Sequence, residues 1–304
     1  METALQSILS LTVIAEFIIG NLSNGFIVLI HCIDWANGRK LSSVNQIFTA
    51  LAIFRIGLLW EMLIYWFATL CFSSSFIPGT EIRILSFAWI VTNHFSSWLA
   101  TILSIFYLLK IANFSSPVFL YLKWRVKKVI LAILLGNLFF LLLNLIQINV
   151  YINDWSHRYE RNTTWNSRMR DFTVFSGLTL FTMSMFTFIP FTVALVSSLL
   201  LIFSLWKHLK NMQLNSKRPS DPSTNAHINA LKTVVSFLLL YFIFFLSFLI
   251  AWVSKMMQKK LVFLLAQIIG FAYPSSHSFI LILGNSRLRQ PFLLVLVAEV
   301  WAER

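Results

Sequence analysis

The sequence predicts an all-α membrane protein: one bundle of seven transmembrane helices, with the N-terminus outside and the C-terminus in the cytoplasm. Three observations lead to this prediction. Hydrophobic residues make up 58% of the 304 residues and charged residues 12%, whereas soluble domains contain about half apolar and a quarter charged residues. Seven apolar runs each reach the roughly 20 residues that a helix needs to cross a bilayer. Lys and Arg residues gather in alternate connecting segments.

The apolar runs are continuous, which indicates helices rather than the short alternating strands of a membrane barrel. The predicted spans cover residues 8–30, 46–70, 84–109, 129–150, 178–205, 230–254 and 261–284. Neither a Gly/Ser-rich linker nor an internal repeat divides them, so residues 1–304 are predicted to form a single domain. The tail, residues 285–304, contains the apolar stretch Pro291–Trp301 at helical spacing. This stretch is too short to span, and an amphipathic helix on the inner membrane surface is predicted.

The distribution of basic residues predicts the orientation. Fifteen of the 24 Lys and Arg residues lie in the tail and around the segments that follow the first, third and fifth spans, and eight lie in the other connecting segments. The richer side is predicted to be cytoplasmic. The net charge of +13 therefore indicates topology rather than binding to nucleic acid. The sequon Asn162-Thr163-Thr164 agrees, because it falls in a predicted outer loop where glycosylation is expected.

Polar residues inside the spans are costly in lipid and need partners. Arg55 lies in the middle of the second span, and we expect it to bind Asn24, backbone carbonyls or the last span near Ser278. Such a contact is either a static pin between helices or a pin that changes partners during activation. Pro190 and Pro274 interrupt two spans and predict kinks, which are either static or points of pivoting.

Four residues in the outer halves of the second and third spans suggest a ligand pocket: Trp66, Trp89, Asn93 and His94. Trp89 and Asn93 are four residues apart and share one helix face. A large aromatic ring above an amide suits a pocket for varied organic molecules. Ordinary packing between helices, or the preference of Trp for the membrane interface, is the alternative interpretation.

The carboxylates Glu16 and Glu61 lie in the outer halves of their spans. They either extend to interfacial water or serve as the acceptor for a ligand or a proton. Together with Arg55 they support a rival hypothesis, a seven-helix transporter or ion-coupled carrier. An enzyme, a metal site and a cofactor are not predicted, because the sequence has no HExxH, no Gly-rich phosphate loop, no GxSxG and no Cys/His cluster. A retinal-binding opsin would need a Lys midway along the last span. Residues 261–284 contain none, so this class of protein is also excluded.

Several motifs in the spans occur in an order that resembles one family, the type 2 bitter taste receptors, along essentially the whole chain. They are Gly20–Ile27, Leu51–Ile56, Thr92–Ser96, Phe106–Ser115, Asp221–Thr224 and His277–Asn285. The resemblance implies a seven-helix receptor with an agonist pocket in its outer half. The family's pocket positions correspond here to Trp66, Trp89, Asn93, His94, Phe244 and Gln267. Many members have Tyr at the position of Phe244 and some have Glu at that of Gln267, so a cation-selective pocket is not expected.

The resemblance also implies signalling at the plasma membrane. Bitter agonists would shift the bundle toward a state that activates a heterotrimeric G protein of the gustducin type, with phospholipase C and calcium as later steps. The positions of Asn24, Arg55, Pro190, His277 and Ser278 would then serve packing or activation. The inner cavity would be framed by Tyr107, Lys110, His208, Lys210, His227 and Lys232. For the lysines, a role in topology and contact with lipid headgroups alone is the alternative.

Overall fold

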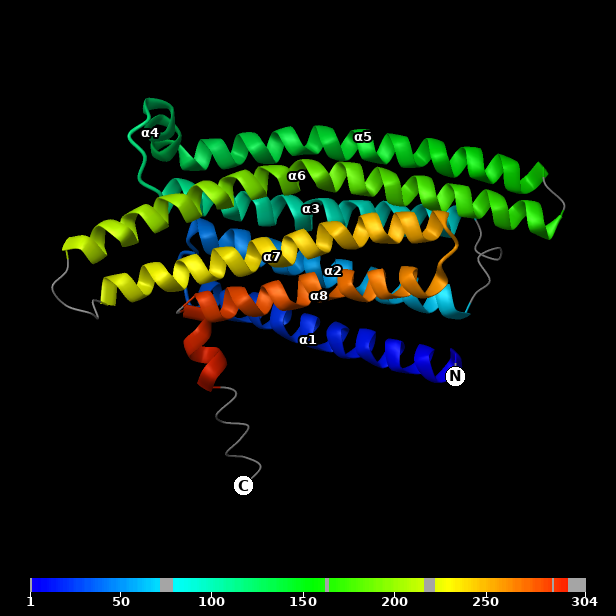
Figure 1. Cartoon of the computed structure of the whole chain (residues 1–304), viewed down its shortest axis with the longest axis horizontal. Coiled ribbons are helices and arrows are strands. Elements are labelled where there is room, and N and C mark those ends of the chain that lie inside the picture. Colours follow the sequence, from blue (N-terminus) through cyan, green and yellow to red (C-terminus); the bar gives the residue numbers. More distant parts are fainter. Residues whose placement is uncertain (1, 72–78, 162–163, 216–221, 286, 295–304) are drawn as a thin grey trace, which may run out of the picture.

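The chain folds into a bundle of long, nearly parallel helices (Figure 1). The structure, a computed structural model, describes residues 2–71, 79–161, 164–215, 222–285 and 287–294. In these residues it contains helices α1 (Glu2–Ala36), α2 (Ser43–Cys71), α3 (Gly79–Ile111), α4 (Pro117–Trp124), α5 (Val126–Arg161), α6 (Trp165–Asn215), α7 (Pro222–Met256) and α8 (Lys260–Gly284). All except α4 are long and apolar enough to cross a membrane, which confirms the predicted seven-helix bundle.

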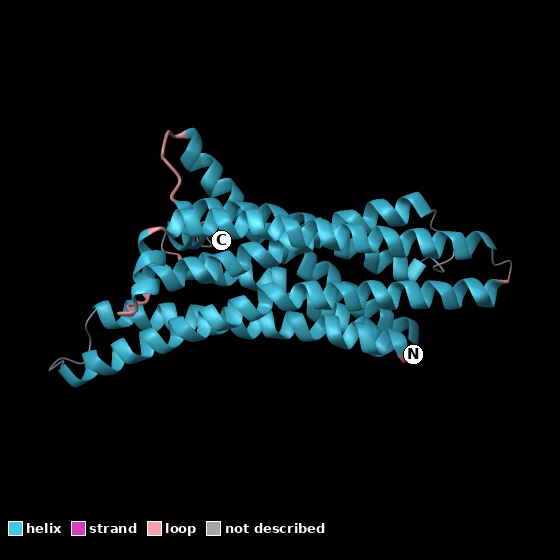
Figure 2. Cartoon of the chain, turned by 90° about the horizontal axis from the view of Figure 1, so that it is seen from above, coloured by secondary structure: helices cyan, strands magenta, loops and turns pink. Residues whose placement is uncertain are grey.

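Helix α3 lies at the centre of the bundle. It packs against α2 on one side and against α5 and α6 on the other, and the ring closes where α8 meets α1 and α7. The most apolar window of α3 is 67% buried, whereas that of α5 is only 17% buried. The connecting loops lie at the two ends of the bundle (Figure 2).

The outer surface of α5 shows why the solvent must be lipid. Its exposed large side chains recur at helical spacing along the whole helix. They include Leu131, Leu135, Leu138, Phe139 and Leu142. In water such a stripe would promote aggregation, whereas in a bilayer it faces the hydrocarbon core at no cost.

Each predicted span lies within one of the seven long helices, but several helices continue well beyond it. The largest difference is in α6, which begins at Trp165 whereas the predicted span begins at residue 178. The short helix α4 was not predicted. It has Pro117 in its first turn, where a backbone N–H would have no acceptor within the helix, so the N–H that proline lacks costs no hydrogen bond. These extensions are too polar to be recognised as membrane spans, and helix formation outside the hydrocarbon core leaves no hydropathy signal.

The tail after α8 is helical over residues 287–294. Its Phe292 ring packs 5.4 Å from that of Phe26 on α1 and 5.6 Å from that of Phe279 on α8. The later part of the predicted tail helix lies outside the described residues. Figure 1 places α4 and the helical part of the tail at one end of the bundle, and the start of α1 with the end of α5 and the start of α6 at the other. Which end faces the cytoplasm stays a prediction from the charge distribution.

Candidate functional site

A cavity of about 210 Å³ opens between α2, α3, α6, α7 and α8. It lies near the end of the bundle that carries the N-terminus, because Phe263 in the first turn of α8 and Lys255 in the last turn of α7 line it. Most of its wall is apolar, and aromatic rings dominate it: Tyr65, Trp89, Phe172, Phe175, Phe244, Phe248, Phe263 and Phe271. A concave apolar wall with few polar groups is typical of a site for a small organic molecule.

Helix α6 contributes a regular stripe to this wall. Its lining residues Phe172, Phe175, Ser176, Thr179 and Met183 follow the spacing i, i+3, i+4, i+7 and i+11, so they share one helix face. This spacing was visible in the sequence. It was missed because residues before 178 were assigned to a loop, where a 3.6-residue period has no meaning.

Three of the six predicted pocket residues line the cavity: Trp89, Phe244 and Gln267. The Trp89 ring lies 6.4 Å from that of Tyr65, and the Phe244 ring stacks 4.5 Å from that of Tyr273. Among the described residues, Trp89 Nε1 and Gln267 Oε1 have no hydrogen-bond partner. The wall therefore contains one donor and one acceptor whose hydrogen bonds are not made within the described protein.

The other three predicted pocket residues point elsewhere. Trp66 is fully buried, and its Nε1 donates to Ser10 Oγ at 3.2 Å, so it binds α2 to α1. Asn93 lies one turn below Trp89, with its Nδ2 3.5 Å from Thr187 Oγ1 on α6. The His94 ring lies 6.1 Å from that of Trp98 on the same helix, and Trp98 in turn stacks 6.1 Å from Phe140 of α5. Asn93 is thus below the cavity, whereas Trp66 and His94 belong to helix packing.

Two charged side chains occur among the cavity-lining residues, Glu61 on α2 and Lys255 on α7. The Glu61 carboxylate accepts a hydrogen bond of 2.7 Å from Thr92 Oγ1 on α3. The Lys255 ammonium lies against aromatic rings rather than a carboxylate. In the sequence, Lys255 follows the predicted span 230–254 and is one of the eight basic residues in the other connecting segments, and it was not predicted to be part of a pocket.

Deeper in the bundle, Arg55 forms the predicted pin between α2 and the last span. It is fully buried, donates from Nη1 to Ser278 Oγ at 3.1 Å, and contacts His277 Nδ1 through Nη2. Ser278 Oγ in turn lies 2.7 Å from its acceptor, Asn24 Oδ1 on α1. The guanidinium also sits over the Tyr273 ring, 5.0 Å from its centroid. Side chains of α8, one of them linked to Asn24 on α1, thereby partner both terminal nitrogens of a charge that lipid could not solvate, while Arg55 Nε has no hydrogen-bond partner among the described residues.

The two prolines lie inside helices that continue through them, Pro190 in α6 and Pro274 in α8. The carbonyl of Pro190 accepts a hydrogen bond of 3.0 Å from Thr101 Oγ1 on α3. The carbonyl of Pro274 accepts from Asn24 Nδ2 at 3.4 Å. Both interruptions are therefore held by a neighbouring helix.

At the opposite end, Tyr107 and His277 border a second, small cavity of about 20 Å³. Four of the predicted inner residues are exposed on α3, α6 and α7: Lys110, His208, Lys210 and Lys232. The Lys110 and Lys210 ammonium groups lie 6.0 Å and 5.7 Å from the rings of Phe106 and Trp206. The side chain of His227 and the predicted acceptor Asn162 lie outside the described residues.

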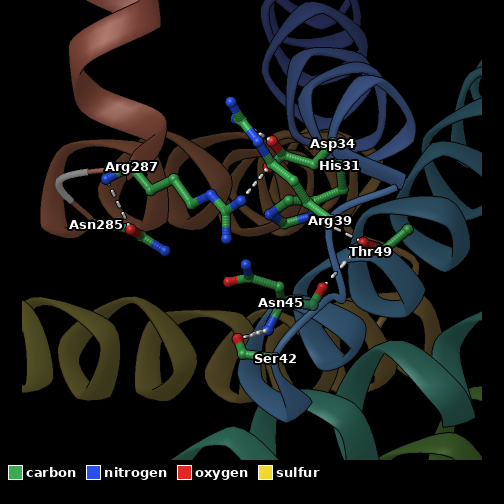
Figure 3. A network of polar contacts seen from close by, with 8 residues as sticks. All are labelled: His31, Asp34, Arg39, Ser42, Asn45, Thr49, Asn285 and Arg287. Carbon is green, nitrogen blue, oxygen red and sulfur yellow. Dashed lines mark hydrogen bonds and ion pairs between the residues drawn. The ribbon is translucent and has the colours of Figure 1, made fainter. Parts of the chain in front are cut away.

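A polar network at this same end of the bundle was not predicted (Figure 3). The Asp34 carboxylate, only 7% exposed, pairs with Arg39 at 3.0 Å and with Arg287 at 2.9 Å. Beside it, His31 Nδ1 lies 2.8 Å from Thr49 Oγ1 on α2. Since Arg287 lies in the tail helix, Asp34 joins the tail to the end of α1 and to the loop between α1 and α2.

Replacing Asp34 by Asn should loosen the tail. Two guanidinium groups would lose their carboxylate, and charge-assisted hydrogen bonds are stronger than those between neutral groups. Amide hydrogen exchange of residues 287–294 is expected to accelerate about tenfold, as measured by mass spectrometry. The matched control is Asp154→Asn, because Asp154 forms an exposed pair with Arg158 at 2.9 Å. Equal exchange in wild type and Asp34→Asn would show that the pair does not hold the tail.

The chain was compared with known proteins. Residues 1–300 match the family described as Taste receptor protein (TAS2R). Taste receptor type 2 member 13 of Gorilla gorilla gorilla and of Homo sapiens are each 64% identical over 304 residues, which covers all of both chains. The protein of the same name from Mus musculus is 57% identical over 296 residues, 97% of each chain. This multi-pass membrane protein therefore belongs to the TAS2R taste receptor family and is a receptor rather than an enzyme.

Proposed function

We propose that this protein is a bitter taste receptor of the plasma membrane. It binds small bitter organic agonists in the outer cavity and activates a heterotrimeric G protein of the gustducin type, which leads to phospholipase C and calcium signalling. One observation carries the proposal: in a taste receptor chain, an apolar cavity with few polar groups lies between five helices at one end of the bundle.

A line of contacts supports a route from the cavity to the centre of the bundle. Phe244 lines the cavity and stacks on Tyr273, and Tyr273 lies under the Arg55 guanidinium. Arg55 contacts His277, which borders the small inner cavity. An agonist that favours one arrangement of Phe244 would shift the population of bundle states, with Asn24, Ser278 and Pro190 at the points where helices are joined.

The positive charge of the inner end supports the proposed activation of a G protein. Lys110, His208, Lys210 and Lys232 are exposed there, and Tyr107 lies beside them at the small inner cavity. In the proposed orientation this end meets both the G protein and anionic lipid. The same orientation places Asn162 outside the cell, where we propose that it carries a glycan.

The rival hypothesis, a carrier, gains no specific support. Among the described contacts none joins Glu16, Glu61 and Arg55. Glu16 does not line either cavity, and its backbone carbonyl accepts from Ser275 Oγ at 2.9 Å as part of the contact between α1 and α8. A proton or ion path through these three residues is therefore not proposed.

A calcium assay tests the proposed function. The chain is expressed in cells with and without a promiscuous Gα subunit, its surface delivery is verified by an N-terminal epitope, and a panel of bitter compounds is applied. Saturable calcium responses that need both the receptor and the Gα subunit are expected. Absence of any response from a chain present at the surface would contradict the proposal, as would responses that persist without the Gα subunit.

Trp89→Ala should weaken agonists strongly. The substitution removes a large aromatic contact from the cavity wall, and the loss of such a contact costs a ligand about 1.5–3 kcal/mol, which raises the half-maximal concentration at least about tenfold. Trp60→Ala is the matched control, because Trp60 is 53% exposed and packs on Phe17 outside the cavity. Unchanged dose–response curves for Trp89→Ala at equal surface expression would remove the outer cavity from the proposal.

A further inference from the structure

Lys255 occupies an unusual position at the mouth of the outer cavity. It is one residue from the end of α7 and lines the cavity together with Phe172 of α6 and Phe263 of α8. Its ammonium lies 5.5 Å from the centroid of the Phe172 ring and 5.2 Å from that of Phe263. The group is thus held between two rings from neighbouring helices, and this places a positive charge at the wall of an apolar site.

No carboxylate forms an ion pair with Lys255 within the part of the chain that the structure describes. Aromatic faces attract a cation, but they replace only part of the hydration that it loses at an apolar wall. An anion that entered the cavity would supply the missing partner through a charge-assisted hydrogen bond. A bound anion would therefore give the Lys255 ammonium the polar partner that the described residues do not provide.

The single acidic residue among the cavity-lining residues does not fill this role. Glu61 lies ten positions before the end of α2 at Cys71, or roughly 15 Å deeper along the helix axis. One of its carboxylate oxygens is engaged by Thr92 Oγ1. The cavity thus has a positive group at its mouth, an acidic group in its depth and apolar rings between them.

We propose that Lys255 determines specificity for one class of agonist, aromatic organic acids, whose anionic group pairs with the Lys255 ammonium while the ring system occupies the apolar cavity. The inference rests on the proposed receptor function and adds the chemical class of ligand to it. The neighbouring Lys259 and Lys260 are exposed at the start of α8 and do not line the cavity.

The test uses pairs of compounds that differ in charge alone. Bicyclic aromatic carboxylic acids and their primary amides are applied to the full-length receptor in the calcium assay, as agonists and as competitors of a neutral bitter agonist. The variants are Lys255→Gln, Lys255→Arg and the control Lys259→Gln, all compared at equal surface expression. Lys255→Arg keeps the charge, so it separates loss of the ion pair from loss of packing.

At the wild-type receptor, at least one acid is expected to act at lower concentration than its amide. Lys255→Gln should raise the half-maximal concentration of that acid about tenfold, which corresponds to about 1.4 kcal/mol, and leave the amide unchanged. Lys255→Arg and Lys259→Gln should keep the preference for the acid. The inference is overturned if no acid acts at lower concentration than its amide, or if Lys255→Gln weakens acid and amide alike. A persisting response to the neutral agonist would then leave the receptor function standing, whereas loss of every response would contradict both.

Discussion

Arg55→Ala should abolish agonist responses and sharply reduce the amount of folded receptor. Arg55 is fully buried, and its removal leaves His277 and Ser278 without their donor and opens a cavity between α2 and α8. Ser278 keeps its hydrogen bond to Asn24, but a buried polar group that loses its partner, here His277, costs about 1–3 kcal/mol, and the cavity adds to this. A loss of about 3 kcal/mol is a large part of the stability of an ordinary domain.

Surface labelling and heating in detergent, followed by size-exclusion chromatography, measure this loss. Arg55→Lys is expected to recover part of the folded protein, because an ammonium keeps the charge but lacks the planar fork that reaches His277 and Ser278 together. Arg289→Ala is the control, since Arg289 is exposed on the tail. An Arg55→Ala receptor with wild-type surface level, melting temperature and calcium response would show that the pin is dispensable.

Gly20→Ala should destabilise the bundle although it adds one methyl group. A Cβ at Gly20 would lie 2.5 Å from Ser275 Oγ and 2.7 Å from Leu59 Cδ1, because α1 meets both α8 and α2 at this point. Ser275 cannot move freely, since it donates to the Glu16 carbonyl at 2.9 Å. Overpacking of this kind costs about 1–3 kcal/mol.

Gly25→Ala provides the matched control on the same helix. A Cβ at Gly25 meets no neighbouring helix of the described structure within 4 Å. Alanine is favoured over glycine in a helix by about 0.8–1.0 kcal/mol, so this variant should be as stable as wild type or more stable. Thermal denaturation in detergent should therefore rank Gly25→Ala at or above wild type and Gly20→Ala below it. The reverse order would contradict the close approach of the three helices.

The contrast between these two glycines shows what the sequence reveals. Hydropathy and the positions of the basic residues were sufficient for the seven spans, because the cost of exposing apolar or charged groups to the wrong solvent is large and local. The contact of Arg55 with Ser278 was also predictable, since a buried charge in lipid must find partners. Gly20 and Gly25 look alike in the sequence, and only the packing of neighbouring helices distinguishes them.

The pocket was predictable only in part for the same reason. Helical spacing shows which residues share a face, but not which neighbouring helix that face meets. Trp66, Trp89 and His94 are all aromatic residues in the outer halves of spans, yet only Trp89 faces the cavity. Lys255 was missed because its charge was counted as topology, although the rings of α6 and α8 hold it at the cavity wall. These distinctions depend on the rotation of each helix about its own axis.

The central claim, that agonists occupy the outer cavity, is tested most directly by protection of an introduced cysteine. Ser86 lines the cavity on α3, whereas Thr80 is exposed on the same helix and does not line it. In a receptor whose Cys32 and Cys71 are replaced by Ser, Ser86→Cys and Thr80→Cys are labelled with a water-soluble thiol reagent with and without a saturating agonist. The agonist is expected to slow labelling at position 86 and to leave position 80 unchanged. Equal labelling rates at position 86 with and without an agonist that still evokes calcium signals would contradict the claim.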